Sequence, residues 1–422
     1  MVDKNLFLYD LAVVAIFKNE GHYLKEWLDY HLFAGVEHFY LYNNNSTDNY
    51  AEVLAPYIEK NLVTLTDVPG KLMMYPAYND AIDKYRFDCR YMAFIDIDEF
   101  VYPKVDRGEG IIKLIDEILS NKPHAAGLGI NWQCFGSNGQ ETADYSRGVL
   151  ERFTRRAPSD WDAKVKGGNV YRKTIDNPRL IRYRLNPHFA DYFNGKSAVN
   201  SNGDYIGTWY GNKPILSDKI VVNHYYVKSK EEFVKKKLPQ GSCCMDSNYS
   251  MQSFYRYDRN EEFDDGILNY RAARKKNFSF ENDTARVNRV INVLVQTLMQ
   301  TSPDDSFTGK MEIFLTCRAV AEKFQIKIGE HLAEEYALAL IYRTLVKANP
   351  LTYLEVQQFL KALPEILSRP FPICKDIKDL TQDNVLPRLC EALKNGDVIK
   401  GIEDWTERSH MIHLQQLLRL IK

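Results

Sequence analysis

Short apolar runs alternate with amphipathic helical patterns over the first hundred residues, and this alternation restricts the fold more than any other feature of the chain. The run at 11–17 (LAVVAIF) has the length of a buried strand. Residues 22–34 carry an apolar stripe at helical spacing, and Gly35 follows where a C-terminal cap belongs. The same patterns predict strands at 38–42, 62–65 and 91–97, and helices at 50–60 and 77–85.

Strands that alternate with helices at this spacing predict βαβ units with right-handed crossovers. The expected fold class is therefore α/β, with a Rossmann-like, mostly parallel sheet flanked by helices. Ligands of such sheets bind beyond the carboxyl ends of the strands. Phe17, Asn43 and the pair Asp96 and Asp98 all fall at those ends. We therefore expect a functional site at this edge of the sheet.

The pattern changes near residue 282 to long helical stretches separated by Pro, Ser and Asp. We predict two domains, an α/β domain at 1–280 and an all-α domain at 281–422. The last helical stretch, Trp405–Lys422, is amphipathic. Packing within the protein is the expected use of its apolar side, and peripheral contact with a partner or a membrane surface is the alternative.

The overall composition favours a soluble, cytoplasmic protein. The formal net charge of −1 gives no electrostatic reason to expect nucleic acid as a partner. The 7 cysteines show no C-x-x-C spacing, which indicates reduced thiols rather than a disulfide framework or a zinc site. A bilayer-spanning helix needs about 20 apolar residues. The early apolar run at 11–17 is far shorter, so no secretory or spanning segment is expected.

Three acids, Asp96, Asp98 and Glu99, lie at the end of the predicted strand at 91–97, in the sequence YMAFIDIDEF. If Asp96 and Asp98 lie two apart on a strand, their side chains point the same way. Two carboxylates held together repel unless a divalent cation neutralises them, and Mg²⁺ or Mn²⁺ also binds phosphate oxygens. The expectation is a metal–diphosphate site, and the alternative is a set of capping or salt-bridged acids. Glu99 is expected to point to the opposite side and to have a structural or supporting role.

Several motifs together resemble glycosyltransferase family 92 and bacterial relatives close to family 2. They are AVVAIFKNEGHYLKEW near the N-terminus, YMAFIDIDEFVYP, NWQCFGSNG and VVNHYYVKSKEEFVKKK, in this order. The resemblance covers residues 11–265. It implies a GT-A fold, a nucleotide-sugar donor, a Mn²⁺ or Mg²⁺ ion and transfer with inversion at the anomeric carbon. A UDP-sugar is the favoured donor, and a glycan or lipid-linked saccharide of polysaccharide biosynthesis is the favoured acceptor. The cytoplasm is the expected location of the protein, and the inner face of the membrane is the alternative.

The resemblance also implies roles for residues near the first strands. Lys18, Asn19 and Glu20 stand where related enzymes hold the base and ribose, and capping of the next helix is the alternative. Asn43 and Asn44 occupy a position that is often acidic in relatives, which weakens any inference about the base. The remaining position implied to face the donor is Asn79.

Two further segments carry implied roles. His224, at the end of the strand IVVNH, stands where a histidine completes the metal shell, so the metal set is Asp96, Asp98 and His224. Trp132 and Gly136, in WQCFGS, resemble the wall of the sugar and acceptor pocket. An aromatic ring offers a stacking face, and glycine permits close approach of the backbone.

Inverting transfer needs a base that takes the proton of the acceptor hydroxyl. Asp160 is the favoured base because Trp161 offers a sugar platform beside it. The acids from which Asp160 is chosen are Glu141, Asp144, Glu151, Asp160, Asp162 and Asp191.

Three other functions compete with glycosyl transfer. A metal-dependent nucleotidyl- or phosphotransferase normally carries a glycine-rich phosphate loop, and FKNEGHYL is not of the form GxxxxGK[ST]. A glycoside hydrolase needs acids on both sides of the glycosidic bond, and one strand end cannot supply them. A non-catalytic sugar-binding scaffold would not bind a nucleoside diphosphate in a metal-dependent way.

Overall fold

The computed structural model describes residues 7–278, except residues 87, 106–109, 121, 164–166, 194, 212, 241–248 and 277. The chain divides into two compact units, and Tyr9–Phe280 is the unit to which nearly all described residues belong. The predicted all-α domain at 281–422 lies outside the described residues, as does the amphipathic stretch Trp405–Lys422. The domain boundary and the role of that region therefore stay predictions.

The alternating pattern of the first hundred residues folds as predicted, into parallel strands joined by helices. β1 pairs in parallel with β2 and β4, and β2 pairs in parallel with β3. The elements in chain order are β1 (Tyr9–Phe17), α1 (Gly21–Ala34), β2 (His38–Asn43), α2 (Tyr50–Glu59), β3 (Val63–Asp67), α3 (Met74–Tyr85) and β4 (Cys89–Phe94).

The second half of the sheet mixes parallel and antiparallel strands. β8 (Arg172–Asp176) lies antiparallel between β4 and β6 (Ala125–Cys134). The sheet order is β12-β11-β6-β8-β4-β1-β2-β3, and β13 pairs with β5 and β6. The other strands of this sheet are β5 (Glu99–Pro103), β11 (Ser197–Val199), β12 (Tyr205–Ile206) and β13 (Ile220–His224). The α/β class with its Rossmann-like sheet is confirmed in the described part of the chain.

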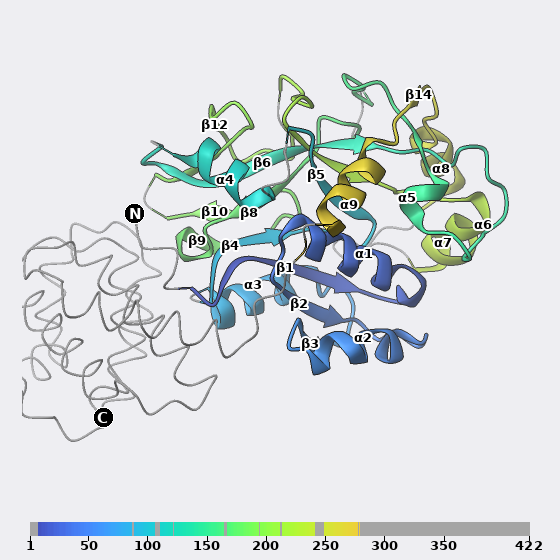
Figure 1. The fold of residues 1–422 in the computed structure, drawn as a ribbon, viewed down its shortest axis with the longest axis horizontal. Helices are drawn as coiled ribbons and strands as arrows, with labels where there is room; N and C mark the ends of the chain where they lie inside the picture. The colour runs from blue at the N-terminus through green and yellow to red at the C-terminus, as the bar shows by residue number, and fades with distance from the viewer. Residues whose placement is uncertain are drawn as a thin grey trace, which may run out of the picture. The chain divides into compact units, whose positions relative to one another are not determined.

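Shorter elements surround this sheet (Figure 1). The remaining helices are α4 (Ile111–Leu119), α5 (Val149–Arg152), α6 (Lys230–Glu232), α7 (Leu238–Gln240), α8 (Met251–Tyr257) and α9 (Gly266–Lys276). A 3-10 turn covers Pro178–Leu180, and a π-helical turn, Phe233–Lys237, joins α6 to α7. Two small sheets pair β9 (Ile181–Tyr183) with β10 (Asp191–Tyr192), and β7 (Arg155–Arg156) with β14 (Glu262–Phe263).

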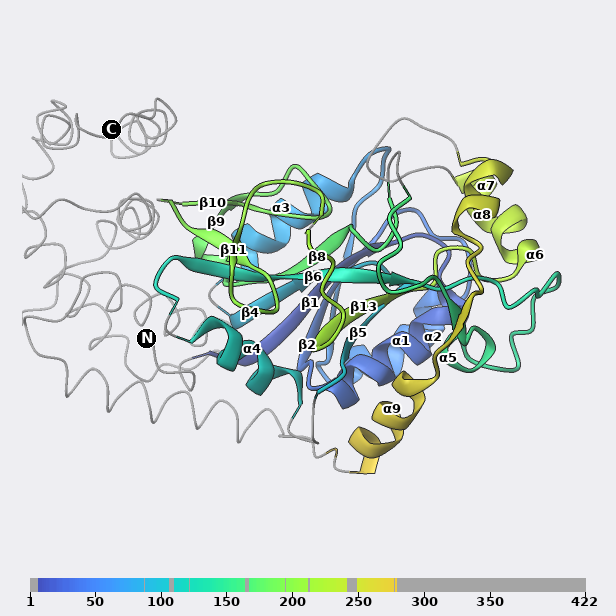
Figure 2. The same cartoon turned by 90° about the horizontal axis from the view of Figure 1, so that it is seen from above.

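Helices cover both faces of the large sheet. Figure 2 shows α1, α2, α4 and α9 on one face and α3 on the other. α1 buries the predicted stripe, and Trp27 is fully buried. Its Nε1 donates to the carbonyl of Glu99 at 2.8 Å, and Tyr30 Oη donates to the carbonyl of Val101 at 2.7 Å. Because these bonds reach β5, α1 fixes the strand that begins immediately after Asp98.

The connection from β3 to β4 crosses to the other side of β1 and creates a switch point in the strand order. Ligands of open α/β sheets bind at such a point, beyond the carboxyl ends of the strands. β4 ends at Phe94 rather than continuing to 97, so Asp96 and Asp98 lie in the turn before β5. The expectation that both acids sit on a strand is wrong, because the chain turns there to pair β5 with β13.

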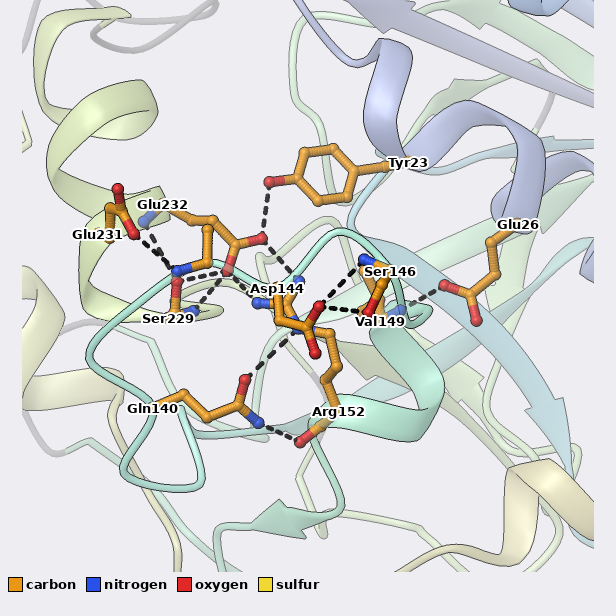
Figure 3. Close-up of polar contacts among 11 residues, drawn as sticks. Tyr23, Glu26, Gln140, Asp144, Ser146, Val149, Arg152, Ser229, Glu231 and Glu232 are labelled. Atoms are coloured by element: carbon orange, nitrogen blue, oxygen red, sulfur yellow. Dashed lines mark hydrogen bonds and ion pairs between the residues drawn. The ribbon is translucent and has the colours of Figure 1, made fainter.

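A buried ion pair fastens the chain segment after β6 to α6. Figure 3 shows the Glu232 carboxylate between Tyr23, Arg152 and Ser229. Arg152 Nη1 and Tyr23 Oη donate to Glu232 Oε1 at 3.0 and 2.8 Å, and Arg152 Nη2 contacts Oε2. Ser229 and Glu232 also form a capping box at the start of α6. We call Tyr23, Arg152, Ser229 and Glu232 the Glu232 clamp.

The Glu232 clamp is both buried and charged. The side chains of Arg152 and Glu232 are each only 2% exposed. Burial favours the neutral acid, but hydrogen bonds from Arg152 and Ser229 outweigh it and keep the pKa of Glu232 below its usual value. The π-helical turn that follows directly carries Lys236 and Lys237. The Glu232 clamp therefore positions these two lysines.

No helix among the residues that the structure describes has the length and apolar composition needed to cross a bilayer.

We expect Glu232→Gln to destabilise the described unit. The substitution leaves the Arg152 guanidinium buried without a counter-charge, and breaking one side of a buried pair costs roughly 3–5 kcal/mol. The free energy of unfolding from urea denaturation measures the loss. Lys235→Gln on the same helical segment is the control, because Lys235 pairs with Glu231 at the surface. An equal effect of both variants would contradict a structural role for the Glu232 clamp.

Candidate functional site

A cavity of about 700 Å³ lies beyond the carboxyl ends of the central strands. It is the place that the switch point predicts for a ligand. Of the twelve residues predicted as site residues, those that line the cavity are Lys18, Glu20, Asn44, Asp96, Asp98, Trp132 and His224.

The residues that line the cavity fall into two groups along the chain, before and after Asp96 and Asp98. The first group comes from the segments that follow β1, β2 and β3, with Lys18, Asn44 and Gly70. We call the part of the cavity that it lines the N-terminal half. The second group comes from β6, β8 and the segments near them, and it includes Trp132 and Tyr171. We call the part that it lines the aromatic half.

Asp96 and Glu99 share one lysine. Lys173 Nζ of β8 lies 2.9 Å from Asp96 Oδ2 and 3.2 Å from Glu99 Oε2. Burial lowers the pKa of Lys173, but Asp96 and Glu99 outweigh it and hold that pKa well above its usual value. The Glu99 carboxylate also accepts a bond from the Asp96 backbone at 2.9 Å. Glu99 therefore turns toward the same lysine as Asp96, and the expectation that it points to the opposite side is wrong.

Glu99 is fully buried behind the cavity. Burial raises the pKa of Glu99 to about 8, although Lys173 opposes the shift. Lys173 therefore contacts both carboxylates, and Glu99 supports the site from behind rather than lining it.

Asp98 has its own cationic partner. Lys237 Nζ of the π-helical turn lies 2.7 Å from Asp98 Oδ2, and His224 Nε2 lies 3.6 Å from Oδ1. Burial raises the pKa of Asp98, but Lys237 and His224 outweigh it and hold that pKa well below its usual range. Burial lowers the pKa of His224, which favours the neutral imidazole. Asp98 is therefore an ionised carboxylate paired with an ammonium group.

The three residues predicted to hold a metal lie together at the turn after β4, and His224 Nε2 lies 3.6 Å from Asp98 Oδ1. Asp96, Asp98 and His224 offer carboxylate and imidazole donors, which suit a divalent ion. Both carboxylates, however, already have lysine partners. The described residues contain no group of three or more His, Cys, Asp or Glu that could hold a metal ion. Lys237 thus occupies Oδ2 of Asp98, one of the oxygens that a divalent ion would use.

The segment after β1 contacts the lysine-bearing turn. Lys236 Nζ forms an ion pair with Glu20, and Gln240 Nε2 donates to the carbonyl of Lys18 at 2.9 Å. Asn19 adopts a left-handed backbone with φ 54°, and its Oδ1 accepts a bond from the Thr47 backbone at 2.7 Å. Lys18 and Glu20 therefore face the cavity, whereas Asn19 joins the two loops behind it.

The three predicted asparagines have different environments. Asn44 lines the cavity and donates to the carbonyl of Val68 at 2.7 Å. Asn43 is buried and donates to Asp67 at 2.8 Å, which ties the ends of β2 and β3 together. Asn79 exchanges hydrogen bonds with the backbone of Arg184 at 2.7 and 2.8 Å. Neither Asn43 nor Asn79 is among the residues that line the cavity.

Gly136 and Asp160 also lie outside the cavity lining. A Cβ at Gly136 would come within 2.3 Å of the Arg259 carbonyl, so the close approach is to the chain itself. Asp160 is exposed, while the neighbouring Trp161 packs against the core. The role of Asp160 as the base therefore stays a prediction.

Several cavity residues were not predicted from the sequence. Lys236 and Lys237 fall in the run VKKK, which has the composition of a solvated helix face. Lys173 falls in a segment without clear periodicity. The run YRKTID could have indicated β8, but its buried basic residues break the apolar pattern of a strand. The aromatic half also contains Tyr171 and His188.

Comparisons with known proteins place these residues in a family. The chain is 35% identical over 195 residues to the galactan beta-1,4-galactosyltransferase GALS2 of Arabidopsis thaliana, an alignment that covers 43% of this chain and 35% of GALS2. It is 26% identical over 229 residues to a glycosyltransferase family 92 protein of Oryza sativa subsp. japonica, which covers 54% of this chain and 35% of that protein. The alignments thus span about a third of the length of these relatives.

Among solved structures, S. aureus TarS 1-349 in complex with UDP matches with 12% identity, covering 87% of this chain and 95% of that chain. The TM-score of 0.30 is too low for a comparison of the two folds. The family, in contrast, follows from the sequence itself. The model of glycosyltransferase family 92 matches residues 13–238, which is more than half of the chain, so the chain belongs to glycosyltransferase family 92.

Proposed function

We propose that the chain transfers a sugar from a nucleotide-sugar donor to a hydroxyl of a glycan, and that the cavity at the switch point is where this occurs. The observation that carries the proposal is the charge of the cavity. Among the described residues, five lysines and three carboxylates line it: Lys18, Lys71, Lys173, Lys236 and Lys237 with Glu20, Asp96 and Asp98. The excess of positive charge suits the diphosphate of a nucleotide sugar.

The two halves of the cavity suggest how the donor lies. A diphosphate near Lys236 and Lys237 leaves the N-terminal half, with Lys18 and Asn44, for the nucleoside. The sugar then points toward the aromatic half, where Trp132 and Tyr171 offer ring faces. Lysine ammonium groups near the diphosphate would stabilise the negative charge that grows on the leaving group.

The relatives suggest which substrates to test first. Because GALS2 is named as a galactan beta-1,4-galactosyltransferase, we propose a UDP-sugar such as UDP-galactose as donor and a β-1,4-linked galactan or similar glycan as acceptor. Attack of an acceptor hydroxyl on the face opposite the diphosphate would invert the anomeric centre. The proton of that hydroxyl goes to a base, for which Asp160 is the residue predicted from the sequence.

We also propose that Mn²⁺ or Mg²⁺ binds at Asp96 and Asp98 together with the donor. Such an ion neutralises diphosphate charge when bound. Lys237 competes with the ion for Asp98, since its Nζ lies at 2.7 Å from Oδ2. Metal binding is therefore expected to be weak in the empty protein and strengthened by the diphosphate.

Incubation with a panel of nucleotide sugars and β-1,4-linked galacto-oligosaccharides tests the proposed function. We expect an extended oligosaccharide and free UDP, detected by mass spectrometry. Asp98→Asn should reduce turnover by roughly 10²-fold or more, because the variant disturbs charges placed at the leaving group. Lys235→Gln, at the exposed surface of the π-helical turn that carries Lys237, should turn over normally. Absence of both transfer and UDP binding would contradict the proposal.

Calorimetric titration of UDP in Mn²⁺ and in EDTA tests the proposed ion. We expect tighter binding of UDP in Mn²⁺. Lys237→Gln should bind Mn²⁺ alone more tightly than the wild type, because Asp98 then has no competing ammonium group. Asp98→Asn should lose the effect of Mn²⁺ on UDP. If UDP binds equally well in EDTA, lysines alone neutralise the diphosphate and the proposed ion is wrong.

The predicted base can be tested separately from the donor site. If Asp160 accepts the proton, Asp160→Asn abolishes transfer and leaves UDP affinity unchanged. Asp191→Asn serves as a control from the same group of acids. Normal turnover of Asp160→Asn would exclude the assignment.

A further inference from the structure

Two aromatic rings lie exposed side by side near the aromatic half of the cavity. Trp209 is 49% exposed and Tyr210 is 47% exposed. Their ring centroids are 6.5 Å apart. Exposed aromatic surface of this kind marks binding sites more often than single scattered apolar residues do.

The loop that carries these rings is fastened to β8. The backbone of Arg172 donates to the carbonyl of Tyr210 at 3.2 Å, and its guanidinium donates to the carbonyl of Gly207. Gly211 forms a bridge with Tyr171, and a Cβ there would come within 2.1 Å of the Val170 carbonyl. Because Gly211 allows this close packing, the backbone of both aromatic residues is held in place.

A continuous series of rings connects this loop with the cavity. The ring of Tyr210 lies 6.3 Å from those of Tyr171 and His188, which line the cavity. Tyr171 lies 5.2 Å from Trp132, and Trp132 lies 4.2 Å from His224. His224 in turn contacts Asp98. The exposed rings are therefore the outer end of a wall that reaches the acids.

We propose that Trp209 and Tyr210 form an acceptor subsite that binds sugar residues of a glycan chain outside the cavity. This proposal rests on the proposed function. The C–H face of a pyranose packs against an aromatic ring, and the hydroxyl groups at its edge remain hydrated or bond to polar tips such as the Tyr210 hydroxyl. The wall consists of aromatic rings without a formal charge, so it suits the neutral acceptor better than the charged nucleotide.

The subsite has a consequence for the size of the acceptor. Trp209 and Tyr210 add contacts only for an acceptor that is long enough to extend from the cavity to these rings. The acceptor class is therefore an oligosaccharide or polysaccharide, and affinity should increase with chain length.

Titration of the full chain with β-1,4-linked galactobiose and galactotetraose in the presence of UDP tests this subsite. The wild type should bind galactotetraose more tightly than galactobiose. Trp209→Ala and Tyr210→Ala should each weaken galactotetraose binding by roughly five- to tenfold, with the affinity for UDP unchanged. Trp209→Phe keeps a ring and should retain most of the affinity. The change in intrinsic fluorescence on addition of galactotetraose should be smaller in Trp209→Phe than in the wild type.

Phe263→Ala is the matched control, because Phe263 is 63% exposed but belongs to the small sheet of β7 and β14. Equal galactotetraose affinity in the wild type and Trp209→Ala would overturn the subsite, as would wild-type protein that binds UDP but neither sugar. A change in oligomeric state of Trp209→Ala, with sugar binding intact, would show that these rings contact protein instead. Failure of UDP binding in the wild type would instead refute the proposed function.

Discussion

The ion pairs of Lys173 and Lys237 with the acids after β4 are the interactions on which the cavity depends. Asp96, Asp98 and Glu99 lie within four residues of one another, and Glu99 is fully buried. Removing an ionised group from water costs several kcal/mol. The two lysines compensate this cost for Asp96 and Asp98, and a raised pKa reduces it for Glu99. Because Lys173 comes from β8 and Lys237 from the π-helical turn, the same contacts join two distant segments to the sheet edge.

Most strands and helices between residues 11 and 100 could be predicted because their sequence signals are local. Apolar runs and helical stripes between residues 11 and 100 identify each strand and helix, and the strand ends locate Phe17, Asn43, Asp96 and Asp98. The need for a positive charge at the acids also follows from their spacing. The spacing of the acids does not reveal which groups supply the positive charge. Lys173 and Lys237 lie 77 and 139 residues from the carboxylates that they contact. No local pattern connects residues so far apart.

The middle of the chain was harder to predict for a physical reason. β8 is fully buried although it begins with Arg172 and Lys173. Those charges are tolerated only because partners from other elements surround them, so the apolar pattern that identifies a buried strand is missing. Arg152 and Glu232 are a second example. Both side chains are buried, although the sequence alone would predict each of them to lie at the surface. Polar groups buried around a site therefore make sequence patterns least informative where function is concentrated.

The two halves of the cavity are built from different parts of the chain. The N-terminal half is built from residues before the acids, and nearly all of the aromatic half from residues after them, on β6, β8 and the loops beyond. Only the turn with Asp96 and Asp98 belongs to both. Under the proposed function, substitutions between 125 and 226 that spare Lys173 and His224 are expected to affect the acceptor more than the donor. The separation along the chain would allow the two substrate sides of the proposed enzyme to change independently in evolution.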